Sequence, residues 1–396
     1  MGNVKNVPKL RFPGFTDAWE QRKVQDIYKI TRGYVLAAPE TAETSSEEMP
    51  YPVYSSQTKN NGLMGYYKDY LYENAITWTT DGANAGTVCY RAGKFYCTNV
   101  CGVLLSDDGH SNKCAAEALN SVAWKWVSHV GNPKLMNNVM GEIPITLPKS
   151  VEEQDRISDF FEQIDTLIAL HQRKCDEAKN LKKCMLQKMF PKDGEQFPEI
   201  RFPGFTDAWE QRKLGDMASF SKGSGYSKGD LKDDGTPIIL YGRLYTKYET
   251  VISEVDTFVD EKKGSVLSKG GEVIVPASGE TAEDISIASV VEKSGVLLGG
   301  DLNIITPPDD MDSAFLAISI SNGKPHNDMA KMAQGKSVVH LHNSDLEKID
   351  LPYPSYDEQR RISEFFSDLD KLITLHQRKC DEIIVLKKAL LQQMFV

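Results

Sequence analysis

The strongest constraint on this chain is a duplication within its own sequence. The thirteen residues RFPGFTDAWEQRK stand at 11–23 and recur without a change at 201–213. A second phrase, LHQRKCDE, occupies 170–177 and again 375–382. The first phrase returns after 190 residues and the second after 205, so the copies enclose segments of unequal length. A scaffold repeated around unlike inserts predicts a protein that presents two different surfaces in one fixed geometry.

The enclosed segments, roughly 24–150 and 214–355, are expected to form separate globular parts. A chain of 396 residues has room for two or three domains that each bury a core. Its composition, with 40% hydrophobic and 26% charged residues, is typical of a soluble globular protein. No apolar run approaches the ~18 residues that a membrane helix needs, and the N-terminus lacks the apolar stretch of a signal peptide. We therefore expect a cytoplasmic protein without a membrane partner.

The seven cysteines predict neither a disulfide framework nor a zinc site. Cys97 and Cys101 are the closest pair, and no second pair completes a set of zinc ligands. We expect reduced, mostly buried thiols and no bound metal.

The net charge of −10 argues against a nucleic-acid binder that works alone, because phosphate contacts dominate such affinity. The excess of acidic residues is clearest in the second enclosed segment. A DNA-binding role would require local basic patches or a partner that brings positive charge.

Two long helices are predicted, each carrying one LHQRKCDE phrase. Glycine and proline are absent from Glu152 to Phe190, and Pro191 and Gly194 end the run. Apolar residues recur at the heptad spacing of a coiled coil. The a positions are Ile157, Ile164, His171, Ala178, Met185 and, in the second helix, Ile362, Leu369, His376, Ile383, Leu390. The d positions are Phe160, Leu167, Lys174, Leu181, Lys188 and Phe365, Leu372, Lys379, Leu386, Gln393.

The connection between the helices predicts that they pair antiparallel. Each would be ~58 Å long at ~1.5 Å per residue. A parallel pairing would force the linker at 191–213 to cross that length back, whereas an antiparallel pairing returns the second helix toward the first segment. We expect two unlike domains at opposite ends of a rigid rod, related by a pseudo-twofold axis.

His171 and His376 fall at matching positions of the two helices. They could form a metal pair or a pH switch, or they could be polar residues that fix the register where the helices cross. We favour the register role.

The repeated phrase at 11–23 is expected to be a strap that docks on its domain. Pro13 and Gly14 predict a turn, and Phe12, Phe15 and Trp19 are expected to pack in the core.

The fold class that we predict is α+β: two β-rich α+β domains separated by a two-helix antiparallel coiled coil, with a pseudo-twofold internal repeat. Short helices are expected at 115–130 and 311–322. Apolar runs between Gly, Asp and Asn predict strands at 75–79, 87–90, 102–105, 237–241, 272–275 and 303–305. The expected division is domain 1 at 1–150, helix 1 at 151–190, a linker with domain 2 at 191–355, and helix 2 at 356–396.

No arrangement of a nucleophile, a base and an oxyanion site is recognisable. The sequence has neither Gly-x-Ser-x-Gly nor the Asn-Pro-Pro-aromatic tetrapeptide that positions an adenine amino group for methylation. KMAQGKS at 331–337 departs from a phosphate-binding loop, because Ala330 stands where the first glycine would be. We expect a non-catalytic chain.

Polar loops remain as candidates for contact with a polymer. Gln and Asn bond bidentately to adenine and Arg to guanine, while Ser, Thr and Lys suit phosphates. Each loop alone fits a solvated turn better, and the duplicated scaffold is what favours two reading surfaces. The candidates in the first segment are Tyr54, Ser55, Ser56, Gln57, Thr58, Lys59, Asn60, Thr80, Asp81 and Asn84. Those in the second are Tyr241, Arg243, Tyr245, Lys247, Ser278, Glu280, Lys331, Gln334, Lys336, Ser337 and His340.

Over nearly its whole length the chain resembles the specificity subunit of type I restriction-modification systems. The resemblance rests on the duplicated strap, on both LHQRKCDE phrases, and on the proline-flanked helix starts IPITLPKSVEEQDRIS and IDLPYPSYDEQRRIS. The stretch at 336–354 also fits the end of a target-recognition domain of this family. The stretch at 131–149 lacks its His-Leu pair, so contacts inferred from Lys336 to His340 do not transfer to the first segment.

The resemblance implies a bipartite double-stranded DNA target, with each domain reading one half-site and the helices setting the gap. It also implies two methyltransferase (modification) subunits and ATP-dependent restriction subunits as partners. S-adenosylmethionine, ATP and Mg would belong to those partners, and no cofactor is expected on this chain. Two alternatives stay open: a scaffold that binds only proteins, and a solitary nuclease or methyltransferase with an unrecognised motif.

Overall fold

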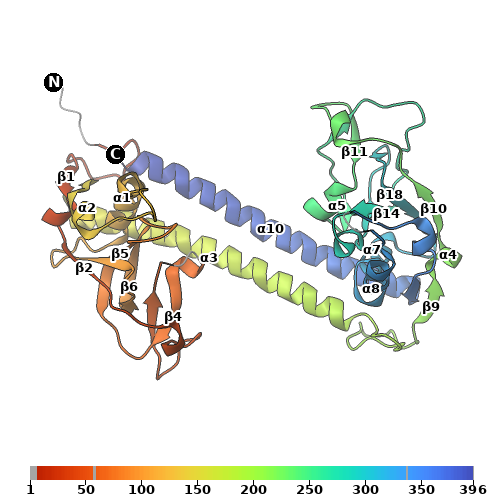
Figure 1. Cartoon of the computed structure of the whole chain (residues 1–396), viewed down its shortest axis with the longest axis horizontal. Helices are drawn as coiled ribbons and strands as arrows, with labels where there is room; N and C mark the ends of the chain where they lie inside the picture. The colour runs from red at the N-terminus through yellow and green to blue at the C-terminus, as the bar shows by residue number, and fades with distance from the viewer. Residues whose placement is uncertain (1–6, 57–58, 336–337, 396) are drawn as a thin grey trace. The chain divides into compact units, whose positions relative to one another are not determined.

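The computed structural model describes residues 7–56, 59–335 and 338–395. The chain divides into two compact units: unit 1 contains residues 1–172 and 378–396, and unit 2 contains residues 173–377. Helices α3 (Val151–Lys188) and α10 (Tyr356–Met394) each begin in one unit and end in the other (Figure 1). Within the described ranges, no helix combines the length and the apolar character that crossing a membrane requires.

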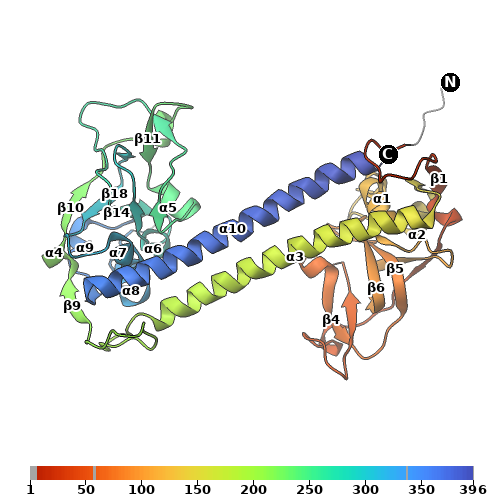
Figure 2. The same cartoon turned by 180° about the vertical axis from the view of Figure 1, so that it is seen from behind.

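Unit 1 is built on a six-stranded sheet in the order β2-β7-β5-β6-β3-β4, of which Figure 2 labels β4, β5 and β6. Neighbouring strands run antiparallel except β3 and β6, which run parallel. The strands are β2 (Lys29–Arg32), β3 (Tyr51–Tyr54), β4 (Leu63–Tyr67), β5 (Tyr72–Thr79), β6 (Val88–Cys97) and β7 (Cys101–Leu105). Helices α1 (Lys113–Ala123) and α2 (Asn137–Glu142) complete the unit, with 3-10 turns at Val24–Asp26, Ala38–Glu40, Lys59–Gly62 and Trp124–Trp126.

The sheet of unit 1 is buried on both faces because the residues of β5 alternate between two cores. Ile76 and Trp78 pack with Leu119 of α1, whereas Ala75 packs with Phe95 on the opposite side. Gly102 lies opposite Trp78 in the register, and a Cβ there would lie 2.1 Å from the indole ring. The close approach of β7 to this ring therefore requires glycine.

Unit 2 contains a five-stranded sheet in the order β10-β18-β14-β16-β12 and a three-stranded sheet in the order β13-β11-β17. The first is formed by β10 (Ser219–Lys222), β12 (Val251–Ile252), β14 (Glu272–Pro276), β16 (Ser289–Val291) and β18 (Leu302–Thr306). The second is formed by β11 (Thr236–Ile239), β13 (Phe258–Val259) and β17 (Leu297–Leu298). A further pair joins β15 (Ser278–Gly279) to β19 (Val339–His340).

The helices of unit 2 are short except for the segments of α3 and α10. They are α4 (Leu214–Met217), α5 (Gly242–Thr246), α6 (Ala282–Ile285), α7 (Ser313–Ile320), α8 (Gly323–Met332) and α9 (Asn343–Leu346), with a 3-10 turn at Lys228–Asp230. All six runs predicted to be strands overlap strands of the structure, α1 overlaps the range 115–130 predicted to be helical, and α7 lies within the range 311–322. The predicted α+β class is confirmed.

Each unit repeats one small sheet at the base of its long helix. In unit 1, β1 (Glu20–Lys23) pairs antiparallel with β8 (Pro144–Leu147). In unit 2, β9 (Glu210–Lys213) pairs in the same way with β20 (Asp350–Tyr353). Each pair joins the end of a strap to the residues just before the helix, so the variable part lies between two hydrogen-bonded strands.

The strap of each unit is fixed to the first turns of its helix by a buried ion pair. Arg11 donates two hydrogen bonds, of 2.6 and 2.8 Å, to the carboxylate of Glu153, which is 2% exposed. Arg201 binds Glu358 through the same two atoms at 2.6 and 2.7 Å. Trp19 is buried as expected, but Phe12 and Phe15 are only partly buried, because the strap lies over the helix rather than inside a core.

The helix pair is antiparallel in each unit, as predicted. In unit 1, Asp165 of α3 forms an ion pair with Lys387 of α10, at 2.8 Å. In unit 2, Lys182 of α3 pairs with Asp370 of α10, at 2.5 Å. Lys182 and Asp165 each recur 205 residues later as Lys387 and Asp370, so the two ion pairs are copies of one interaction. This internal symmetry agrees with the predicted repeat.

Most of the predicted d positions are wrong by one residue, while Phe160 and Phe365 are partly buried against the cores of their units. Leu167 and Leu181 are 46% and 44% exposed, and Leu372 and Leu386 are 41% and 53% exposed. The residues that face inward are instead those at the a positions and those that follow each a position by four residues. That second series comprises Phe161, Ile168, Cys175 and Lys182 in α3 with Met189 just after its end, and Phe366, Ile373, Cys380, Lys387 and Met394 in α10. At several turns the residues three and four positions after an a position are both apolar. The sequence pattern therefore does not show which of the two faces the partner helix.

His171 and His376 are partly buried and lie at matching positions of the inward series. No group of three or more His, Cys, Asp or Glu in the described residues is arranged to hold a metal ion. The register role of the two histidines stays a prediction. All seven cysteines are free thiols.

Candidate nucleic-acid interface

The first predicted loop of unit 1 begins where β3 ends. The N–H of Ser55 donates to the carbonyl of Gly62 at 2.8 Å, which closes the loop. Asn60 and Asn61 have φ values of 48° and 57°, in the left-handed region that asparagine tolerates better than most residues. Gln57 and Thr58 lie outside the described residues, and Lys59 and Asn60 belong to the 3-10 turn.

The second predicted loop of unit 1 begins where β5 ends. Thr80 is 7% exposed, and its hydroxyl donates to the carbonyl of Val100 at 3.0 Å. Asp81 forms an ion pair with Lys134 at 3.6 Å. Asn84 is the link between the loops, because its side-chain amide donates to the carbonyl of Ser56 at 3.2 Å. The structure therefore brings the two predicted loops of unit 1 together, with Thr80 as a buried support.

Arg91 of β6 lies beneath both loops and was missed in the sequence. Its guanidinium lies 3.7 Å from the centre of the Tyr54 ring. Its Nη2 donates to the carbonyl of Asn61 at 2.8 Å, and its Nε donates to the hydroxyl of Thr77 at 3.2 Å. A single arginine within a strand carries no recognisable signal, since only the folded sheet shows that it supports the loops.

The predicted residues of unit 2 fall on three elements. Tyr241, Arg243, Tyr245 and Lys247 lie on and beside α5; Ser278 and Glu280 lie at β15; Lys331, Gln334 and His340 lie around β19. Burial is the main cause that raises the pKa of the Tyr245 phenol, followed by the charges of Tyr241, Glu280 and Asp284. The α5 residues and the end of β15 therefore lie close together. Lys336 and Ser337 lie outside the described residues.

The loop that follows α8 is closed by backbone hydrogen bonds. The N–H of His340 donates to the carbonyl of Gln334 at 2.8 Å, and the reverse bond is 3.1 Å. In the register, His340 lies opposite Ser278, which is 4% exposed. Ser278 is thus a support for this loop, while the exposed His340 stacks beside His342 with ring centres 6.5 Å apart.

Arg243 is engaged within the protein. Its guanidinium forms ion pairs with Asp256 at 2.6 Å and Glu249 at 2.9 Å, and it also donates to the carbonyl of Glu254 at 2.8 Å. The side chain is 8% exposed. To contact a base, Arg243 would have to break these ion pairs and this hydrogen bond. Its predicted contact with DNA therefore competes with contacts inside the protein.

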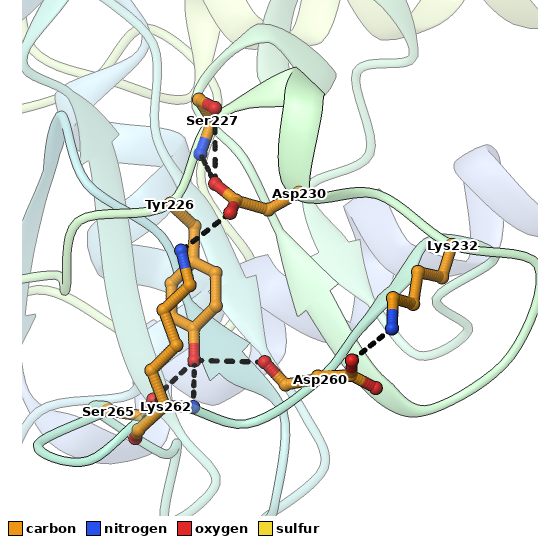
Figure 3. A network of polar contacts seen from close by, with 7 residues as sticks. All are labelled: Tyr226, Ser227, Asp230, Lys232, Asp260, Lys262 and Ser265. Carbon is orange, nitrogen blue, oxygen red and sulfur yellow. Dashed lines mark hydrogen bonds and ion pairs between the residues drawn. The ribbon is translucent and has the colours of Figure 1, made fainter.

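A polar network holds the outer loops of unit 2 together (Figure 3). Lys262 forms an ion pair with Asp230 at 2.6 Å, and its ammonium lies 4.6 Å from the ring centre of Tyr226. The hydroxyls of Tyr226 and Ser265 are 2.5 Å apart. The hydrogen bond from Lys262 and the N–H of Ser227 lower the pKa of the Asp230 carboxyl to about 2. The network joins the segment before β11 to the segment after β13.

Asp230→Asn is expected to speed amide hydrogen exchange in 226–232 by roughly twofold to fivefold, since an exposed ion pair contributes modestly. Because the pKa of Asp230 is lowered in the folded state, its contribution is present above about pH 4 and is lost as pH falls through about 2. Hydrogen exchange at pH 6 measures the effect. Asp233→Asn, which removes a neighbouring exposed carboxylate outside the network of Figure 3, is the control. Equal exchange in both variants would contradict the role of Asp230.

Two α+β units, each closed by a copied strap and each contributing to an antiparallel helix pair, define a class of internally duplicated proteins. The family model of the type I restriction modification DNA specificity domain matches residues 16–180 and again residues 206–384. The chain therefore belongs to the type I restriction-modification specificity family.

The relatives extend from fragments to whole chains. A putative type I specificity subunit N-terminus of Mycoplasma pneumoniae is 42% identical over 136 residues, which cover 33% of this chain and 71% of the relative. Three further putative specificity subunits of that organism match over only 51%, 64% and 39% of their own lengths. The MjaVIII specificity subunit of Methanocaldococcus jannaschii is 22% identical and aligns over 98% of this chain and 94% of its own.

The fold is shared with solved structures at low identity. The S subunit of a type I restriction-modification system from M. genitalium has a TM-score of 0.69 at 14% identity, covering 98% of this chain and 99% of its own. A chain from a structure of the assembly and conformational transition of the type I R-M system has a TM-score of 0.52 at 13% identity, with 98% coverage of both chains. At these identities the likeness concerns the fold alone.

Proposed function

We propose that this type I specificity subunit recognises a bipartite double-stranded DNA target, with unit 1 reading one half-site and unit 2 the other. The observation that carries the proposal is the double match of the family model, once over each unit. Each match encloses a different set of polar loops at strand ends. Two unlike loop sets on one repeated scaffold support two unlike half-sites.

In this proposal the helix pair sets the gap between the half-sites. Its support is the pair of copied ion pairs, Asp165 with Lys387 and Lys182 with Asp370, which hold the helices in register within each unit. The partners would be two methyltransferase subunits and the ATP-dependent restriction subunits. S-adenosylmethionine, ATP and Mg would act on those partners, while this chain directs them and catalyses no step itself. The partners would also supply positive charge for DNA binding, because this chain has a net charge of −10.

Exchanging residues 24–150 for the matching segment of another family member is expected to change one half-site completely and to leave the other half and the gap unchanged. The reason is that the exchanged segment carries the loops of unit 1 only. Sequencing of methylated adenines in cells that carry the subunit with its partners gives both half-sites at once. The reciprocal exchange of residues 214–355 is the matched control, and it should change only the other half.

A change in both halves after either exchange would contradict independent reading. A gel-shift assay with random-sequence duplexes separates the remaining alternatives. If neither the chain nor its complex with a methyltransferase prefers any sequence, the chain is a protein-binding scaffold. Methyl transfer or cleavage by the purified chain alone would identify it as an enzyme.

A further inference from the structure

Arg91 in unit 1 is a buried cation that uses two of its five N–H donors within the described residues. The residue is 8% exposed, and its Nε and Nη2 are bound to Thr77 and Asn61. Within the described residues, Nη1 makes no hydrogen bond to a protein atom. The guanidinium also lies 3.7 Å from the centre of the Tyr54 ring, so its position is fixed from three sides.

The charge of Arg91 has no protein counter-charge in the described parts of the chain. No carboxylate oxygen lies within 4.0 Å of a guanidinium nitrogen of Arg91 in those parts, so no ion pair forms there. The neighbouring titratable groups on which its charge acts are the thiols of Cys89, Cys97 and Cys101. Burial raises the pKa of all three thiols, that of Cys101 to about 11, so they are neutral near pH 7. A buried cation without a counter-charge is costly, and it is usually retained for a ligand or a network.

Arg91 also lines a hollow of about 130 Å³ between the two predicted loops of unit 1. Ser55 and Asn61 line it from the loop after β3, and Asn84 and Thr87 line it from the loop after β5. Since a water molecule takes about 30 Å³ in the liquid, the hollow has room for about four waters or one tetrahedral anion. Hydroxyl and amide groups of this kind are common ligands of phosphate.

We infer that the hollow receives one phosphate group of the DNA backbone, bound by Nη1 of Arg91 and by the polar side chains of the two loops. The inference rests on the proposed function and adds an anchoring residue to it. Nη1 retains both of its N–H groups for a phosphate oxygen, and the hydroxyls of Ser55 and Thr87 in the same hollow also suit phosphate. Arg91 therefore positions the DNA backbone and does not select a base.

The test uses the full chain in complex with its methyltransferase subunits, on a duplex with the target and on a scrambled duplex. Arg91→Gln is expected to weaken binding to both duplexes by the same factor, about tenfold. The slope of log K against log salt is expected to fall by about 0.9, the value for one phosphate contact. Arg22→Gln removes a positive charge from β1 of the same unit, outside the hollow, and should leave the slope unchanged.

A second variant separates phosphate binding from loop support. Thr87→Asp places a carboxylate at the rim of the hollow and retains Arg91 with its hydrogen bonds to Thr77 and Asn61. It is expected to weaken both duplexes in the same way. A loss confined to the target duplex, or an unchanged salt slope in Arg91→Gln, would overturn the inference. If the unaltered complex binds both duplexes equally, the proposed function fails, whatever Arg91 does to the slope.

Discussion

Arg11→Met is expected to destabilise unit 1 by about 3–5 kcal/mol, because it leaves a charged carboxylate buried without its cation. Glu153 is 2% exposed and receives two hydrogen bonds from Arg11. Its remaining side-chain partner is Trp19, whose indole N–H donates at 3.3 Å. One neutral donor cannot replace a guanidinium that also neutralises the charge. The strap should therefore detach from the first turns of α3.

The copy in unit 2 is the internal comparison. Arg201→Met leaves Glu358 at 1% exposure, and the indole nitrogen of Trp209 has no hydrogen-bond partner in the described structure. We expect a loss at least as large as in unit 1, since no indole supports this carboxylate. The effect of each variant should be confined to its own unit, because each ion pair lies wholly within one unit.

Hydrogen exchange resolves the two units separately, which a single unfolding curve of a two-unit chain does not. The double variant Arg11→Met with Glu153→Gln is the control. It removes both charges together and is expected to recover most of the stability, because a buried pair costs much of what it gains. A loss below about 1 kcal/mol in Arg11→Met would show that solvent reaches Glu153 and that the strap is not fixed by this pair.

The long helices could be predicted because the heptad pattern continues over many turns. The residues that face the partner helix could not, because they depend on which residues lie opposite. At one turn of α3 the sequence offers Leu181 at +3 and Lys182 at +4. Hydrophobicity favours Leu181, yet Leu181 is 44% exposed and Lys182 is inward, paired with Asp370. A lysine becomes a good inward residue only when an aspartate 188 residues away lies opposite it.

The positions of the loops could be predicted from the sequence, but the contacts of the side chains in and beneath them could not. Polar runs after β3 and β5 point to adjoining loops, and the bond from Asn84 to Ser56 brings them together. For two arginines, the expectation from the sequence differs from the structure. Arg243 looked free in the sequence but is bound by Asp256 and Glu249, because the chain after α5 folds back over it. Arg91 looked unremarkable within a strand, but it lies beneath the loops of unit 1 and has no counter-charge among the described residues.

Four residues inserted into α3 after Gln172, with four inserted into α10 after Gln377, are expected to lengthen the gap between half-sites by about two base pairs. Four residues add ~6 Å to a helix at ~1.5 Å per residue. DNA rises ~3.4 Å per base pair, so ~6 Å corresponds to slightly less than two pairs. Both insertion points lie where one compact unit gives way to the other, so the loops of each unit are unchanged.

Helical phase makes the four-residue insertion the favourable length. Four residues turn an α-helix by about 40° beyond one full turn, and two base pairs turn DNA by about 70°. The reading surfaces would thus stay within about 30° of the DNA phase. A seven-residue insertion in both helices preserves the seam and adds ~10.5 Å, which is about three base pairs. It leaves the units almost unrotated while the DNA turns by about 100°, so it should methylate poorly at any gap.

Methylated adenines, sequenced in cells that carry each variant with its methyltransferase subunits, report the gap and both half-sites together. A variant with polar substitutions at the exposed Leu167 and Leu372, and no insertion, keeps the length and should keep the gap. A gap that stays the same after the four-residue insertion would mean that the DNA contacts, and not the helices, set the distance. Altered half-sites would mean instead that the insertion disturbs the loops. Only a longer gap between unchanged halves agrees with a helix pair that measures DNA, because the insertion lengthens the helices and leaves the loops of both units unaltered.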